Sequence, residues 1–441
     1  MTNIELIENG EERVVKKFQE TRKTSPLNPK LASINEKALK RFETLKFPHR
    51  KHEMFSFVDT KDLASTDFQY RYGPESPLNP ELLKDFIYPE SRDSVIVIVD
   101  GRYDTALSNT SRLDKTIELK SLDEAIGDAE LNNYLLDTVD REEDVFASLN
   151  GAFLRDGLMI HVLSNSQIER PLQILHVSTG SKGSPVTTVP RVIVKLENDT
   201  KLDLIIQSIG IDGNYFLNSI QDFILDKSAT LNLVQWQSDP NNSWFFSKSW
   251  ITLSEDSQFK STTASNGNRL TRHHYHVRMT GEKADLSLNG ISVLCDQEQV
   301  HNYVRVHHEA PDCRSDQLFK NIIQDEGRSS IDTTVIVHEG AQLTESHQLI
   351  NNLLLSDDGV ADTKPNLMIY ADDVKCDHGA TIGQISEDQL FYLKSRGLAE
   401  DEAKTLLTSS FANTVLQEID CPSLKARLKE TLLNKLGVKD V

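Results

Sequence analysis

The sequence predicts a mainly β protein with helical regions at both ends. Between about residues 157 and 370, short apolar segments are separated by polar, turn-forming residues, and no convincing helix interrupts the run. Many segments alternate apolar and polar positions, as at Val192, Val194 and Leu196, which is the period of a half-buried strand. After residue 383 the spacing of apolar residues becomes helical. A β-region of this length fits a large sandwich, a barrel or a β-solenoid, and it favours the solenoid because further turns can always be added.

We assign residues 1–156 to a mostly helical N-terminal region. Charged residues and helix formers dominate it up to Leu45. Residues 94–101 read as a buried strand ended by a turn, whereas 121–153 read as helices because apolar side chains recur at a spacing of three and four. That apolar stripe is more typical of internal packing than of a binding surface.

Residues 157–383 form the predicted β core. The predicted strands are 172–177, 192–196, 202–206, 231–234, 286–288, 291–294, 304–306, 331–337, 353–355 and 367–370. The repeat is degenerate in sequence, so the sandwich and the barrel stay open as alternatives.

Residues 384–441 predict a small helical domain. Ser386 can cap a first helix, and a second helix places Leu407, Phe411 and Val415 in one line. A third helix begins at Pro422, and four leucines follow at a spacing of four residues. A domain of this size buries little core alone, so we expect its apolar face to contact the β core or a partner.

Composition excludes some classes of function. The 67 acidic and 48 basic residues give a formal net charge of -19, which argues against sequence-independent binding to nucleic acid or to anionic membranes. No apolar run approaches the roughly 18 residues of a membrane span. The four cysteines are widely spaced and the first residues show no secretory leader, so we expect a reduced, cytoplasmic location.

The candidate site lies at 370–384, where Cys376 and His378 are two positions apart. On an extended strand both side chains point to the same face, roughly 7 Å apart. A thiolate and an imidazole could share one small inorganic ligand, but a metal site needs three or four ligands. A lone Cys-x-His pair is therefore more often part of a core than a site.

Other polar groups have weaker claims. His274 and His276 alternate as two strand ligands would, yet exposed strand histidines are the commoner case, and nothing in the sequence places His307 or Glu309 beside them. Cys295 is expected to be inert, as is Cys313. The chain has neither a phosphate-binding P-loop nor a Gly-x-Gly-x-x-Gly motif.

Five segments, taken in order, resemble the SufB/SufD family of iron-sulfur cluster assembly proteins. They are Ser-Asp-Gln-Leu-Phe-Lys at 315–320, Asn-Leu-Leu-Leu-Ser-Asp-Asp at 352–358, Thr-Lys-Pro at 363–365, Tyr-Ala-Asp-Asp-Val-Lys-Cys-Asp-His-Gly-Ala-Thr-Ile-Gly-Gln at 370–384 and Leu-Phe-Tyr-Leu-Lys-Ser-Arg-Gly at 390–397. Weaker likeness extends over nearly the whole chain. The absence of any cysteine before Cys295 favours the SufD branch, because SufB-like chains usually carry additional N-terminal cysteines.

The resemblance implies a right-handed parallel β-helix between helical terminal domains. It also implies a non-catalytic scaffold that assembles iron-sulfur clusters and passes them to apo-proteins. The implied partners are SufB, paired along the β-helix, and the ATPase SufC, docked on the C-terminal helices. His378 is implied as a ligand of the nascent cluster, with Cys376 the lesser candidate and the missing thiolate on SufB.

The resemblance further implies that the chain alone holds no stable cofactor, although a flavin is associated with the assembled family complex. Two alternatives stay open at this point. One is a β-helix carbohydrate-active enzyme, and the other is a SufB-like homodimeric scaffold.

Overall fold

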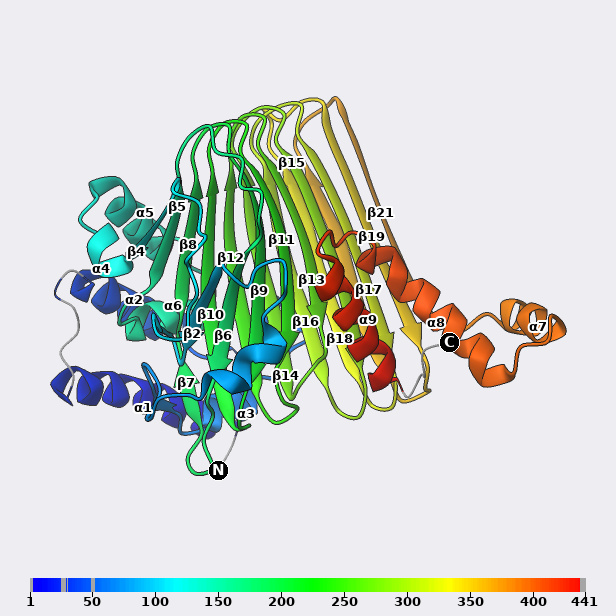
Figure 1. The fold of residues 1–441 in the computed structure, drawn as a ribbon, viewed down its shortest axis with the longest axis horizontal. Helices are drawn as coiled ribbons and strands as arrows, with labels where there is room; N and C mark the ends of the chain where they lie inside the picture. Colours follow the sequence, from blue (N-terminus) through cyan, green and yellow to red (C-terminus); the bar gives the residue numbers. More distant parts are fainter. Residues whose placement is uncertain (1–2, 25–28, 30, 49–51, 437–441) are drawn as a thin grey trace.

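The computed structural model describes residues 3–24, 29, 31–48 and 52–436 (Figure 1). Its centre is a flattened parallel β-helix made of two facing sheets. Sheet A contains β4 (Ile117–Ser121), β5 (Leu158–Val162), β8 (Arg191–Leu196), β10 (Tyr215–Leu225), β12 (Trp244–Leu253), β14 (Leu270–Met279), β16 (Gln299–His308), β18 (Arg328–Val337) and β20 (Val360–Ile369), with β1 (Gln69–Tyr70) and β7 (Val186–Thr188) attached beside β10.

Sheet B is the second sheet and faces sheet A across the interior of the β-helix. It contains β3 (Arg102–Tyr103), β2 (Val95–Val99), β6 (Leu172–Ser178), β9 (Lys201–Gly210), β11 (Thr230–Ser238), β13 (Gln258–Ser265), β15 (Asp285–Leu294), β17 (Arg314–Ile323), β19 (Thr344–Leu354) and β21 (Val374–Gly383). All strand pairs are parallel except β4 with β5 and β2 with β3. The solenoid prediction is confirmed, and the sandwich and barrel alternatives are wrong.

The chain passes from one sheet to the other and back, so each rung is one strand of sheet A followed by one of sheet B, from β8 and β9 to β20 and β21. A residue with positive φ recurs in the turn from sheet A to sheet B, every 27 to 31 residues, at Asp199, Ser228, Asp256, Lys283, Asp312 and Leu343. Left-handed backbone is tolerated best by short polar residues such as aspartate, which explains the aspartates at three of these turns.

The interior of the β-helix is filled by alternate side chains of both sheets. On β16, Val304 and Val306 are fully buried, whereas Arg305 and His307 between them face outward and are half-buried. In-register stacking places equivalent residues of successive rungs on the same face, so apolar columns run along the solenoid.

The α-helices of the N-terminal region pack on the outer face of sheet A (Figure 1), whereas its segment 80–86 packs on strands of sheet B. Its helices are α1 (Asn3–Thr24), α2 (Ala32–Leu45), α3 (Lys61–Ser65), α4 (Leu122–Ala125), α5 (Ala129–Asp140) and α6 (Val145–Phe153), with 3-10 turns η1 (Glu53–Phe55) and η2 (Pro80–Phe86). Phe146 of α6 packs edge-on against Phe246 at 4.8 Å between ring centroids. Strands β2 and β4 of this region also extend the two sheets.

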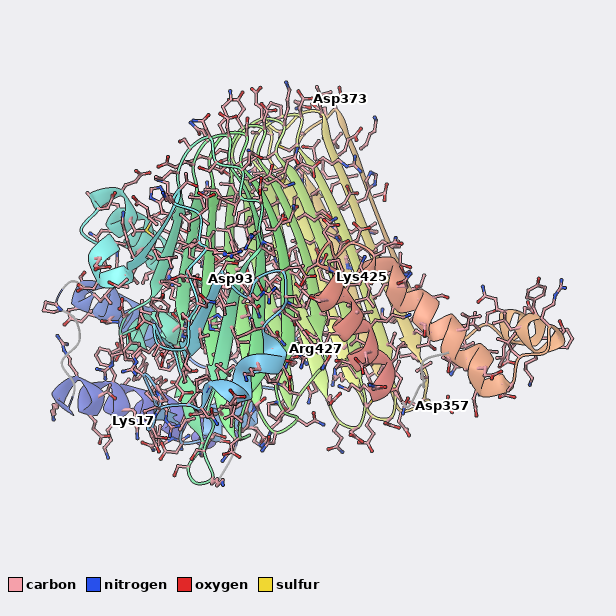
Figure 2. The ribbon with its side chains drawn as sticks, viewed as in Figure 1. Lys17, Asp93, Asp357, Asp373, Lys425 and Arg427 are labelled. Atoms are coloured by element: carbon pink, nitrogen blue, oxygen red, sulfur yellow. The ribbon has the colours of Figure 1, made fainter. Side chains whose placement is uncertain are left out.

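The C-terminal helices lie against sheet B. They are α7 (Glu387–Ser395), α8 (Glu400–Leu416) and α9 (Pro422–Lys435). The leucine stripe of α9 is buried on the outer face of the sheet, and Arg427 of the same helix lies over Phe86 and Trp236 (Figure 2). In contrast, α7 projects away from the β-helix (Figure 1). No helix among the described residues is long and apolar enough to cross a membrane.

Candidate functional site

The predicted site residues lie on the last strand of the solenoid. Cys376 and His378 belong to β21, whose one partner strand within the described part of the chain is β19. The turns flanking β20 contain Asp357 and Asp373, which lie at opposite ends of the final rung (Figure 2). Both sheets therefore end in a ten-residue strand that pairs on one side.

The register shows which way the two side chains point. Cys376 pairs with Ser346 and His378 with Gln348, and both partners are buried on the inner face of β19. The amide of Gln348 donates to the backbone oxygen of Asn366 on β20 at 3.2 Å, so this side chain reaches across the interior from sheet B to sheet A. Cys376 and His378 therefore continue the inner columns of the β-helix at the rung where stacking stops.

Their exposure follows from that position. Cys376 is half-buried and packs against the interior core, whereas His378 is exposed and has no hydrogen-bond partner among the described residues. Among those residues, no third histidine, cysteine or carboxylate completes a three-ligand group with this pair. The structure brings the two predicted ligands to one face but supplies only part of a ligand set.

A polar column leads to the cysteine from inside the solenoid. His308 Nε2 lies 2.9 Å from Ser315 Oγ, and Ser315 Oγ donates to Ser346 Oγ at 2.9 Å. Cys376 occupies the next position of the same column. The three inner polar groups are buried and bonded to one another, so the thiol is the first group of the column that solvent reaches.

The opposite face of β21 is held by polar contacts to β19. Lys375 Nζ forms an ion pair with Glu345 at 2.9 Å, and Asp377 is hydrogen-bonded to His347 Nδ1 at 2.7 Å. These side chains satisfy one another on the outer face. The outer face therefore fixes the strand, and the inner face is left for a ligand.

The thiols of the chain are not activated in isolation. Burial, with a smaller contribution from Asp377, raises the pKa of Cys376 above its usual value. Burial also raises the pKa of Cys295 and of Cys313 to about 11, so both remain protonated at neutral pH, as expected for inert thiols. Cys376 can act as a thiolate ligand only where a metal replaces its proton.

The strand histidines differ from the sequence interpretation. His274 is not exposed but buried, with Nδ1 2.9 Å from Asp144 beneath helix α6. His276 is half-buried, and its ring centroid lies 5.2 Å from that of His307. The expectation of exposed histidines was wrong because the N-terminal helices, which strand periodicity does not report, cover this face of sheet A.

Comparison with known proteins gives consistent matches. Residues 176–411 match the family model described as "SUF system FeS cluster assembly, SufBD core domain", and residues 9–174 match "SufBD protein N-terminal region". The chain is 30% identical over 400 residues to an iron-sulfur cluster assembly SufBD family protein of Synechocystis sp., covering 88% of this chain and 87% of the relative. It is 29% identical over 384 residues to the iron-sulfur cluster assembly protein SufD of Escherichia coli, covering 86% and 87%.

Proposed function

Because the chain belongs to the SufBD family of iron-sulfur cluster assembly proteins, we propose that it is a SufD-type scaffold subunit that holds part of a nascent cluster at the open end of its β-helix. In this proposal the cluster is cargo, and the chain itself is not a catalyst. The observation that carries the proposal is the position of Cys376 and His378 on the inner face of the last strand, which pairs on one side within the described part of the chain.

The two edge strands provide a surface for a paralogous partner. An edge strand exposes a row of unpaired backbone N–H and C=O groups, which pair readily with another strand. Apolar side chains are also exposed around these edges, including Val360, Met368, Tyr370 and Ile382. A SufB β-helix placed against them would continue the sheets and bring its own thiolate to the inner columns.

The chemistry of the pair fits shared cluster binding. His378 offers an exposed imidazole, and imidazole is an accepted iron ligand. Cys376 would add a thiolate once iron displaces its proton, at a cost set by its raised pKa. His378 is therefore the stronger ligand of the two, and the chain alone should hold no stable cluster.

Energy for assembly must come from another subunit, because the sequence has no P-loop. We propose that the ATPase SufC docks on the C-terminal helices. Helix α7 projects from the β-helix. Two of its aromatic side chains are exposed, Phe391 by 75% and Tyr392 by 56%. Any flavin would then belong to the assembled complex rather than to this chain.

The test is cluster reconstitution on the complex purified with candidate SufB and SufC partners. His378→Ala should leave the complex assembled but lower the yield of transferable cluster by at least about tenfold, the usual minimum for a lost metal contact. His347→Ala, on the outer face of β19, is the matched control; it removes one of the two contacts that hold the outer face of β21 but no proposed ligand, so it should lower the yield much less than His378→Ala does. Equal cluster yields from His378→Ala and wild type would overturn the role of His378, and an intact stoichiometric cluster on the single chain would overturn the shared site.

A further inference from the structure

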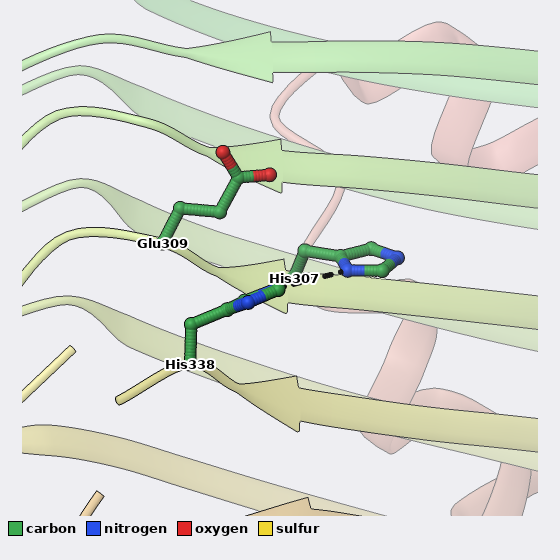
Figure 3. Close-up of side chains that lie close together, drawn as sticks. All are labelled: His307, Glu309 and His338. Carbon is green, nitrogen blue, oxygen red and sulfur yellow. Dashed lines mark hydrogen bonds between the residues drawn. The ribbon is translucent and has the colours of Figure 1, made fainter. Parts of the chain in front are cut away.

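A second group of ligand side chains lies on the outer face of sheet A, away from β21. His307, Glu309 and His338 each offer one ligand atom, and these three atoms lie within 4.8 Å of one another (Figure 3). His307 Nδ1 and His338 Nε2 are 3.3 Å apart. Within the described part of the chain this is the one cluster of three or more such residues with that spacing.

The β-helix register explains why residues so distant in sequence meet. His307 and Glu309 are two positions apart at the end of β16, so both face outward. His338 follows β18 in the next rung, and its backbone N–H donates to the oxygen of His308 at 3.0 Å. This bond places His338 beside Glu309, and its imidazole reaches back to His307.

The spacing suits a metal ion. Two nitrogens bound 2.0–2.1 Å from a tetrahedral zinc are about 3.4 Å apart, close to the observed distance between the imidazoles. At present the two rings can share one proton in a hydrogen bond. A metal ion would take the place of that proton without moving either backbone.

A neighbouring arginine holds the carboxylate of this group in place. Both oxygens of Glu309 accept from Arg278 at 2.7 Å, which orients the carboxylate and leaves its remaining lone pairs for a ligand.

We propose that His307, Glu309 and His338 bind one divalent transition-metal ion of the zinc or ferrous type. Two imidazoles and one carboxylate form a set that both ions accept, and one that leaves coordination positions open. His307 and Glu309 line a cavity of about 620 Å³, which several arginines also line. The site is on sheet A and the proposed cluster ligands are on sheet B, so this inference goes beyond the proposed function and does not rest on it.

The test is metal titration of the purified chain carrying Cys376→Ser and His378→Ala, so that no ion bound at β21 is counted. Zinc binding is measured by calorimetry, and cobalt(II) is added separately because its visible absorption reports nitrogen and oxygen coordination. We expect one ion per chain. His307→Gln and His338→Gln should each weaken binding at least about tenfold.

His347→Gln is the matched control. This exposed histidine is hydrogen-bonded to Asp377 on the neighbouring strand, as His307 is to His338, but no third ligand lies within reach among the described residues. The control variant should bind zinc as the parent does. His338 is itself exposed, so its variant should fold normally, which the circular dichroism spectrum and melting temperature will check. No zinc binding to the folded parent, or binding that both ligand variants leave unchanged, would overturn the site.

Discussion

The two ends of the β-helix are finished differently. At the N-terminal end, β4 pairs antiparallel with β5 and β3 pairs antiparallel with β2, so each sheet closes with a strand that reverses direction. At the C-terminal end, β20 and β21 remain parallel, ten residues long and paired on one side within the described part of the chain. One end closes within the chain, and the other presents an edge.

Burial follows the same division. Every residue of β2 is buried, whereas no residue of β20 is buried, and Met368 is 46% exposed. Long exposed edges invite pairing with other chains, and proteins usually shorten or cover them. The open edge lies beside the Cys-x-His pair, as the proposed shared site requires.

Breaking the closed end should have the largest effect on stability. Asp144 caps α6 by accepting from the Phe146 N–H, and it is buried against Arg272 and His274 of β14. Asp144→Ala removes the cap and leaves the Arg272 charge buried without its partner, so we expect a loss of about 3–5 kcal/mol in the free energy of unfolding. Denaturant titration followed by circular dichroism measures it.

The matched control is Asp128→Ala. Asp128 caps α5 by accepting from the N–H groups of Glu130 and Leu131, but it is exposed. Its loss should cost about 1 kcal/mol, the usual value for a cap alone. Equal losses for the two variants would show that the buried ion pair does not hold the N-terminal helices on sheet A.

The second largest effect is expected from acid, which should lower the free energy of unfolding through buried histidines such as His176 on β6. Burial lowers the pKa of His176, inside the β-helix, to about 4, and both of its ring nitrogens lack a hydrogen-bond partner among the described residues. Between this pKa and the unfolded value of about 6.5, the unfolded chain binds more protons than the native one. Stability is therefore complete above about pH 6.5 and falls as the pH is lowered toward 4.

The contribution of His176 to that fall is on the order of 3 kcal/mol, at about 1.4 kcal/mol for each unit of pKa shift. Denaturation midpoints measured from pH 7.5 to 4 should decline, and they should decline less steeply in His176→Gln. Parallel pH profiles for the two proteins would contradict this assignment. Burial also lowers the pKa of His273 and of His301 to about 3. The same loss of stability in acid is therefore expected from later rungs of the β-helix.

Sequence reasoning found the parts of the fold whose two faces differ. Alternation predicted β8 and β9, and the spacing of four predicted α9, whose leucines are buried against sheet B. The cap at Ser386 is confirmed, because its side chain accepts from the Gln389 N–H. These signals are local, so a single sequence contains them.

Strands β10 and β12 were not predicted, because their two faces do not differ in burial. β10 and β12 have almost no exposed positions, because the N-terminal helices cover their outer sides, so apolar and polar residues do not alternate. The recurring positive-φ turn residues would have revealed the period of the rungs. Four of the six are aspartate or serine, so a search for these residues at intervals of 27 to 31 would have found part of the period.

The candidate site was predicted only in part. The sequence paired Cys376 with His378, but it could not show that their strand is the last one, because that depends on where stacking stops. It also missed His338, which comes beside Glu309 only through the register of neighbouring rungs. Local spacing cannot report contacts made across a turn of the solenoid.

Charging the open end should change assembly more than stability. Met368 and Ile382, on β20 and β21, are 46% and 50% exposed, so replacing both with lysine should alter the free energy of unfolding by only about 0.5 kcal/mol per site. The same change should abolish co-purification with a SufB partner and any homodimer of the isolated chain, because charged edges resist strand pairing. Sedimentation analysis measures the second effect.

The control for this pair is Leu82→Lys, at a position 51% exposed in η2. It places one lysine at a similarly exposed apolar position away from the open edge. Association that survives the double substitution, or is lost equally in the control, would show that the open end is not the partner surface.

The smallest effect on stability is expected at α7, which belongs to neither end of the β-helix. Phe391 is 75% exposed, so Phe391→Asp should leave the melting temperature unchanged while lowering co-purification of the ATPase subunit. Ile211→Asp, at an exposed apolar position in the turn after β9, is the control and should retain that subunit. If Phe391→Asp reduced SufB binding instead, α7 would be part of the open-end interface, and the division between a scaffold edge and an ATPase-docking helix would have to be abandoned.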